Sequence, residues 1–67
     1  MLSDSSIKRI LKKAGAIRSG KNAIQRLKAL TEDYALLIAR KAVKNAEYSG
    51  RKSVKIEDIE EAIKVEE

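Results

Sequence analysis

Hydrophobic residues recur every three or four positions through one long stretch, Lys21 to Ser49, which contains neither proline nor glycine. This spacing lays an apolar stripe along one side of an α-helix, and Gly50 follows as a typical helix terminator. Such a helix is roughly 43 Å long, whereas a compact globule of this chain length has a radius of gyration of about 11 Å. We therefore expect a second chain to cover part of the stripe. The residues expected in this dimer core are Leu27, Leu30, Tyr34, Leu37 and Ile38.

Two shorter segments with the same spacing flank the long one. The first begins near Ser3, whose hydroxyl can cap free backbone N–H groups, and ends at Gly15. The last begins near Ile56, and acidic residues crowd its first turns, where they suit the helix dipole. Both are too short to be stable alone, so each must pack on the long helix. Their apolar stripes are Ile7, Ile10, Leu11 and Ala14 in the first and Ile56, Ile59, Ala62 and Ile63 in the last.

The pattern thus predicts one all-α domain, residues 1–67, with a short helix, a loop, a very long central helix, a loop and a short helix. Either Ser19 or Gly20 is expected to cap the long helix. The two loops, 16–20 and 51–55, each carry an arginine and a serine beside a β-branched residue. If the long helices of two chains cross antiparallel, the first loop of one chain can pair with the second loop of the other.

Charge is distributed unevenly along the chain. Fifteen Lys and Arg against ten Asp and Glu give a net charge of +5. Residues 1–28 hold eight basic residues and one acid, whereas residues 57–67 hold six acids and one lysine. This asymmetry favours a polyanion-binding face built mainly from the N-terminal third. A solvated surface on a lysine-rich protein is the alternative that composition alone leaves open.

Several classes of function are disfavoured by what the sequence lacks. It has no cysteine and no histidine, so the commonest metal ligand and general base are missing. We expect no enzyme activity, metal, cofactor or small-molecule substrate. No apolar run is long enough to span a membrane, and the N-terminus lacks a signal-peptide core. The first helix has no bulky aromatic anchors for a membrane surface, and we expect a soluble, intracellular protein.

The sequence resembles the archaeal histones, a family of minimal, tail-less histone-fold proteins. The resemblance covers Ile7 to Ile63. It implies a histone fold in a head-to-tail handshake dimer that binds double-stranded DNA through paired loops and first helices. It also implies a location on the chromosome (nucleoid) in the cytoplasm. The residues that carry it are Ile7-Lys8-Arg9-Ile10, Ala14-Gly15-Ala16, Gly50-Arg51-Lys52-Ser53, Val54-Lys55, Glu57-Asp58-Ile59 and Ala62-Ile63.

Positions that contact DNA in the family are occupied by basic residues and a serine. Arginine in a narrow minor groove senses shape and potential rather than a base code, so weak sequence preference is expected. Arg9 and Arg18 taken singly could also be ordinary surface charge. Four lysines are expected to add mainly to the positive electrostatic field rather than to make defined contacts, namely Lys8, Lys12, Lys13 and Lys21. The DNA-contacting positions are Arg9, Arg18, Arg51, Lys52 and Ser53.

Two further features concern structure and assembly. Arg51 and Asp58 match the family's intrachain ion pair, which implies a clamp on the second loop; a weak surface pair is the alternative.

Family dimers join end to end through a leucine and a histidine, with an acid opposite. Here Asn45 and Tyr48 stand at those two positions and Asp58 matches the acid. These changes predict a weak junction, so that dimers, or tetramers joined through another surface, bend or bridge DNA.

The sequence contains two aromatic residues, Tyr34 and Tyr48. Tyr34 is expected in the dimer core, and base stacking is a weaker alternative because two aromatics do not make a platform. We therefore expect a chromatin protein that bends, wraps or bridges DNA with little sequence preference. The alternative function is a histone-fold interaction subunit of a transcription or chromatin complex, whose partner is another protein.

Overall fold

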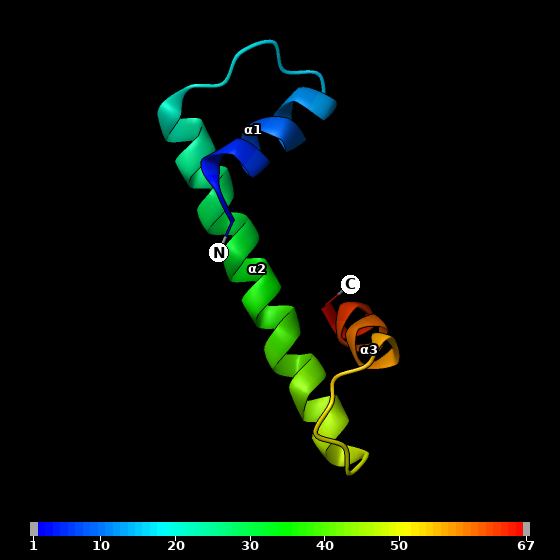
Figure 1. Cartoon of the computed structure of the whole chain (residues 1–67). Coiled ribbons are helices and arrows are strands. Elements are labelled where there is room, and N and C mark those ends of the chain that lie inside the picture. The colour runs from blue at the N-terminus through cyan, green and yellow to red at the C-terminus, as the bar shows by residue number, and fades with distance from the viewer. Residues whose placement is uncertain (1, 67) are drawn as a thin grey trace. The chain divides into compact units, whose positions relative to one another are not determined.

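The computed structural model describes residues 2–66 of the chain (Figure 1). These residues form α1 (Asp4–Lys13), α2 (Lys21–Tyr48) and α3 (Ile56–Glu66). The all-α class and the short, long, short order of helices are confirmed. Contacts divide the chain into two units, Met1–Asp33 and Tyr34–Glu67, and α2 contributes to both. Each unit is described by itself below.

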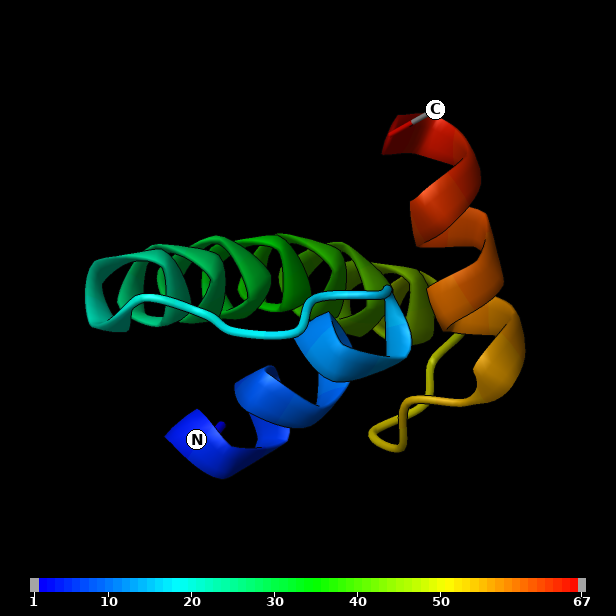
Figure 2. The ribbon, with the colours of Figure 1, turned by 90° about the horizontal axis from the view of Figure 1, so that it is seen from above.

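In the first unit, α1 lies against the beginning of α2 (Figures 1 and 2). Ile7 of α1 and Ile24 of α2 are buried. At the start of α1, the Asp4 carboxylate accepts a hydrogen bond from Gln25 Nε2 at 3.0 Å and pairs with Lys28 Nζ at 3.4 Å. Apolar burial and the two polar contacts of Asp4 therefore hold α1 on α2.

Local hydrogen bonds close both ends of α1. The Ser3 hydroxyl accepts from the Ser6 N–H at 3.2 Å, as expected of an N-cap. At the other end, the N–H groups of Gly15 and Ala16 donate to carbonyls of the last turn, and Gly15 has a φ of +110°. This is a Schellman motif, whose positive φ costs glycine little. Gly15 thereby sets the direction in which the first loop leaves the helix.

In the second unit, α3 packs on the last turns of α2. Ile38, Ala42 and Ala62 form the buried cluster, and Ile59 and Ile63 pack against it. Small side chains at such a contact let two helix axes approach closely. Gly50, with a φ of +72°, ends α2 through a second Schellman motif in which the Arg51 N–H donates to the Ala46 carbonyl at 2.9 Å.

Some details differ from the sequence-based expectations. Ile10 and Ile56 were expected in buried stripes but are exposed, because only one side of each short helix faces α2. Ala14 caps α1 and is exposed rather than packed. By contrast, Gly20 was one of the two expected N-caps of the long helix, and its carbonyl accepts the first α2 bond, from the Ile24 N–H at 3.0 Å. Ser49 lies just beyond the end of α2 rather than at its last position.

Candidate nucleic-acid interface

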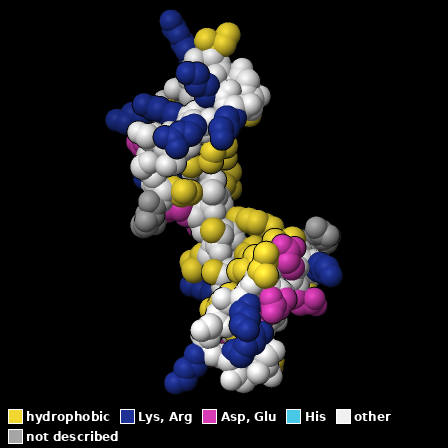
Figure 3. Space-filling model, turned by 45° about the vertical axis from the view of Figure 1, so that its right-hand side comes forward, with side chains coloured by type: hydrophobic (Ala, Val, Ile, Leu, Met, Phe, Trp, Pro, Cys, Tyr) yellow, Lys and Arg dark blue, Asp and Glu magenta, His cyan; other side chains and the backbone are white. Residues whose placement is uncertain are grey.

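The first unit presents a basic surface on α1, the first loop and the start of α2. Lys8 and Lys12 are one turn apart and form one row, and Arg9 and Lys13 form the next. Figure 3 shows Lys and Arg side chains gathered on this unit. All of the basic residues that the sequence analysis assigned here are exposed, namely Lys8, Arg9, Lys12, Lys13, Arg18 and Lys21.

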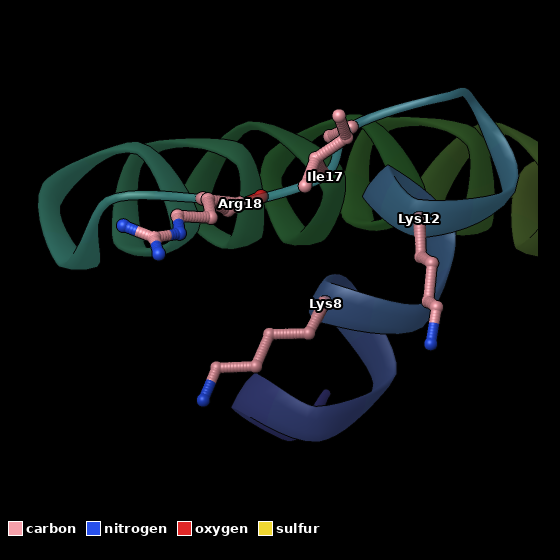
Figure 4. Close-up of a pocket in the computed structure, with 6 residues that line it drawn as sticks. Lys8, Lys12, Ile17 and Arg18 are labelled. Carbon is pink, nitrogen blue, oxygen red and sulfur yellow. The ribbon is translucent and has the colours of Figure 1, made fainter.

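Two shallow hollows bring several of these side chains together. The first has a volume of about 360 Å³ and lies between α1 and the first loop (Figure 4). The second, about 310 Å³, lies between the start of α1 and the start of α2. The first is lined by Lys8, Lys12, Ala16, Ile17, Arg18 and Ser19, and the second by Asp4, Lys8, Ser19, Lys21, Ile24 and Gln25. Arg9 and Lys13 line neither hollow.

The chemistry of this surface suits phosphate groups. Ammonium and guanidinium groups donate charge-assisted hydrogen bonds to phosphate oxygens, and the Ser19 hydroxyl can add another. Asp4 lines the second hollow with them, and its charge is already engaged. The hydrogen bond from Gln25, followed by the contacts with Lys28, lowers the pKa of Asp4 below its ordinary value. The carboxylate therefore stays ionised and is tied mainly to α2, with a smaller electrostatic contribution from Lys8 of α1.

In the second unit, the second loop is held by one buried carboxylate. Asp58, with 4% of its side chain exposed, accepts from Arg51 Nη1 at 2.8 Å and from Arg51 Nη2 at 2.9 Å. Asp58 Oδ2 also accepts from the backbone N–H of Lys55 at 2.8 Å. The carbonyl of Ser53 accepts from Arg51 Nη1 at 3.1 Å. The loop is therefore closed around the Arg51 guanidinium.

This arrangement changes what Arg51 can offer to a ligand. The hydrogen bonds from Arg51, and then from the Lys55 N–H, lower the pKa of Asp58 to about 2, and Asp58 in turn raises the pKa of Arg51. Three of the five guanidinium N–H donors are used inside the chain. Lys52 and Ser53 are exposed. Most of the loop's capacity to bind an anion therefore rests on Lys52, Ser53 and the side chain of Lys55, which is also exposed.

Two contacts in this unit escaped the sequence-based reasoning. Asn45 Nδ2 donates to the backbone carbonyl of Asp58 at 3.1 Å, which ties α2 to the first turn of α3. The bond from the Lys55 N–H to Asp58 is half of a capping box. The three-residue spacing of Lys55 and Asp58 at the start of a helix could have indicated this bond. Nothing in the sequence indicated the Asn45 contact, because it depends on how α3 packs.

The three residues expected at a junction between dimers, Asn45, Tyr48 and Asp58, also lie in the second unit. Tyr48 is 88% exposed at the end of α2. Asn45 is half-buried, and Asp58 is buried with both oxygens bonded. A hollow of about 280 Å³ opens beside Tyr48. Of these three side chains, Tyr48 is thus the one most available to another molecule.

Other kinds of site were sought in the part of the chain that the structure describes. Within residues 2–66, no three acidic side chains are grouped closely enough to hold a metal ion. None of the helices in that range is long and apolar enough to cross a membrane.

Comparison with known proteins gives related sequences over most of the chain. The model of the family described as histone-like transcription factor (CBF/NF-Y) and archaeal histone matches residues 2–63. One of the subunits of the archaeal histone HAN1 from Thermococcus zilligii is 41% identical over 58 residues, which are 87% of each chain. Probable archaeal histone 3 of Methanocaldococcus jannaschii is 46% identical over 56 residues, which are 84% of each chain.

Proposed function

The chain belongs to the family of histone-like transcription factors (CBF/NF-Y) and archaeal histones, and from this we propose that it is an architectural protein of the chromosome that binds double-stranded DNA as a homodimer. Both curated relatives are named as archaeal histones and match over more than four fifths of their length. Binding is to the phosphate backbone and to groove shape, with little preference for sequence.

The observation that carries this proposal is the group of basic side chains around the first loop. Lys8, Lys12 and Arg18 line one hollow, and Lys21 lines the neighbouring one with Lys8. The acid beside them, Asp4, is bound to Gln25 and Lys28. A surface of this kind attracts a polyanion and gives it several phosphate contacts. Arg9 and Lys13 extend it on α1, and in the second unit the second loop offers its own exposed Lys52 and Ser53.

The dimer is supported by apolar surface that the chain leaves uncovered. Leu30, Tyr34 and Leu37 of α2 are 47%, 54% and 41% exposed, and Leu27 is half-buried. Large apolar side chains recurring along one helix mark a protein interface. Ile38, assigned to the same core, is already buried against Ala42 and Ala62 of its own chain. In a handshake dimer the four others are covered by α2 of the second copy.

The alternative is an interaction protein whose physiological partner is a different histone-fold chain. It is favoured by the transcription factors within the same family description and by the word "subunit" in the name of the relative from Thermococcus zilligii. The two functions differ in a simple way. A DNA-binding homodimer needs no second protein, whereas an interaction subunit lacks either stability or DNA affinity by itself.

Binding of the purified chain to duplexes of random sequence at several salt concentrations tests the proposal. We expect the logarithm of the affinity to fall linearly with the logarithm of the salt concentration, with a slope of about −0.9 for each phosphate contact. Sedimentation of the same sample should give the mass of a dimer. A folded monomer, or a chain that binds DNA only when another protein is added, would favour the interaction subunit.

A further inference from the structure

Ile17 lies in the first loop, next to the basic side chains of the first unit, and phosphate binding does not explain it. Among the large apolar side chains that the structure describes, it has the highest exposed fraction, 98%. It directly precedes Arg18 and lines the same hollow as Lys8 and Lys12. A loop that only had to hold phosphates would gain nothing from a branched aliphatic side chain at this position.

The loop holds Ile17 away from the rest of its unit. Figure 4 shows the Arg18 side chain running along the loop, while Ile17 stands off it on the side opposite the ammonium groups of Lys8 and Lys12. The loop is anchored at both ends by backbone hydrogen bonds, to Leu11 before it and from Ile24 after it. Its ends are therefore fixed, and Ile17 is presented to the surroundings instead of folding back onto a helix.

We propose that Ile17 is an apolar wedge that inserts between two base pairs when the first loop enters the minor groove of DNA. This inference rests on the DNA binding proposed above. Proteins that bind the minor groove often combine an arginine, which follows the groove, with an apolar side chain that partly unstacks one base step and kinks the duplex. Arg18 and Ile17 are adjacent and leave the loop in different directions, which suits these two roles.

The wedge adds a preference for easily deformed base-pair steps, which a purely electrostatic surface lacks. Pyrimidine–purine steps such as TA and CA are the easiest to unstack and kink, so insertion costs least there. The protein therefore places its first loop at flexible steps without reading bases by hydrogen bonds. Because Ile17 carries no charge, it affects the bend and the position of the complex more than the salt dependence of binding.

A different explanation for the exposure of Ile17 makes the opposite prediction for the stability of the protein without DNA. If the second loop of another copy covers it, for example at Val54, which is also exposed, the side chain stabilises the dimer and does not touch DNA. Truncating Ile17 would then lower the melting temperature of the protein without DNA. Under the wedge proposal, the melting temperature stays close to that of the wild type.

Duplexes that contain one TA step with 2-aminopurine beside it, in an otherwise G·C-rich sequence, test the wedge with the full chain. Fluorescence of this base analogue rises when it is unstacked, and energy transfer between dyes on the two ends reports the bend. We expect the wild type to increase the fluorescence and to bend the duplex. Ile17→Ala should lose most of both signals, Ile17→Met should keep them, and the control Val54→Ala should resemble the wild type.

Affinity and salt slope, measured on the same samples, separate the wedge from DNA binding itself. We expect Ile17→Ala to bind with only a small change in Kd and with an unchanged slope. Equal fluorescence and bend for wild type and Ile17→Ala, with binding intact, would overturn the wedge and leave the DNA-binding function standing. A lower melting temperature of free Ile17→Ala would also overturn it. Failure of the wild type to bind any duplex would refute the underlying function.

Discussion

Arg51 and Asp58 form a two-point ion pair that joins the second loop to the first turn of α3, with N–O distances of 2.8 and 2.9 Å. The same carboxylate accepts the Lys55 N–H, and the Asp58 carbonyl accepts from Asn45. One residue thus connects the loop, the start of α3 and the end of α2. These contacts fix the second loop without a disulfide, since the sequence has no cysteine.

Asp58→Asn should lower the melting temperature at neutral pH, because asparagine cannot bind the guanidinium as an anion. In the folded chain the pKa of Asp58 falls from 3.8 to about 2. A folded-state pKa below the unfolded one means that the pair stabilises fully above about pH 4 and is lost as pH falls toward 2. The difference in melting temperature between wild type and Asp58→Asn should therefore shrink across this window.

Thermal unfolding followed by circular dichroism at several pH values measures this difference. Glu61→Gln is the matched control, since it removes one exposed carboxylate from the same helix. It should show little effect at any pH. A difference for Asp58→Asn that stays constant between about pH 4 and pH 2 would mean that the ion pair contributes no stability.

Leu37→Asp should abolish the folded protein, although Leu37 is 41% exposed in the single chain. If a second copy covers Leu37, the charge is buried without a partner, which costs about 3 kcal/mol or more. The control is Tyr48→Asp, also an apolar-to-charged change on α2 but at a residue 88% exposed. It should leave the dimer intact. Circular dichroism measures the folding of both variants, and sedimentation at several protein concentrations measures their mass. A stably folded Leu37→Asp monomer would contradict the homodimer.

Helical spacing and the two glycines Gly15 and Gly50 were enough to predict the three helices, because apolar periodicity and helix ends are local features. The two-point contact of Arg51 with Asp58 has the spacing that the family resemblance indicated. The exposure of Ile56 and the bond from Asn45 to Asp58 could not be predicted, since both depend on how α3 rotates when it packs on α2. The same applies to the grouping of Lys8 with Arg18 and Lys21, which depends on the path of the first loop.

Arg18→Ala and Lys52→Ala should each weaken binding to all duplexes alike. Each removes about one phosphate contact per protomer, so the salt slope should become flatter by roughly 0.9 or less for each protomer. Lys64→Ala, an equal charge change on the exposed side of α3, is the control and should alter the slope little. Titrations of random duplexes by fluorescence anisotropy at several salt concentrations measure both. A loss of affinity confined to one sequence would contradict the sequence-tolerant mode.

Arg51→Ala should behave differently from these two variants. Because Arg51 is bound to Asp58 and to the Ser53 carbonyl, its removal leaves a buried carboxylate without its partner and frees the loop. We expect a lower melting temperature together with weaker DNA binding, whereas Lys52→Ala should weaken binding alone. Parallel unfolding and binding measurements test this. Unchanged stability of Arg51→Ala would assign Arg51 to DNA contact rather than to holding the loop.

Assembly beyond the dimer should be limited, because the residues at the end of α2 and the start of α3 do not favour an end-to-end junction. Asn45 presents an amide where an apolar contact is expected, and that amide is bonded to Asp58 of its own chain. Asp58 is buried and its oxygens are bonded to Arg51 and Lys55. Only Tyr48, of the three junction residues, remains largely exposed, and one neutral hydroxyl is a weak basis for such a contact.

We therefore expect DNA complexes to contain dimers, or tetramers joined through another surface, rather than long superhelices. Nuclease digestion of saturated complexes measures this directly. Independent dimers should protect one short footprint, or two where a tetramer forms, without a longer series. Tyr48→Ala should leave this pattern unchanged, because Tyr48 does not join dimers in this arrangement. A regular ladder of fragments that grows by one dimer footprint, and that Tyr48→Ala abolishes, would instead establish end-to-end stacking through the exposed Tyr48 ring.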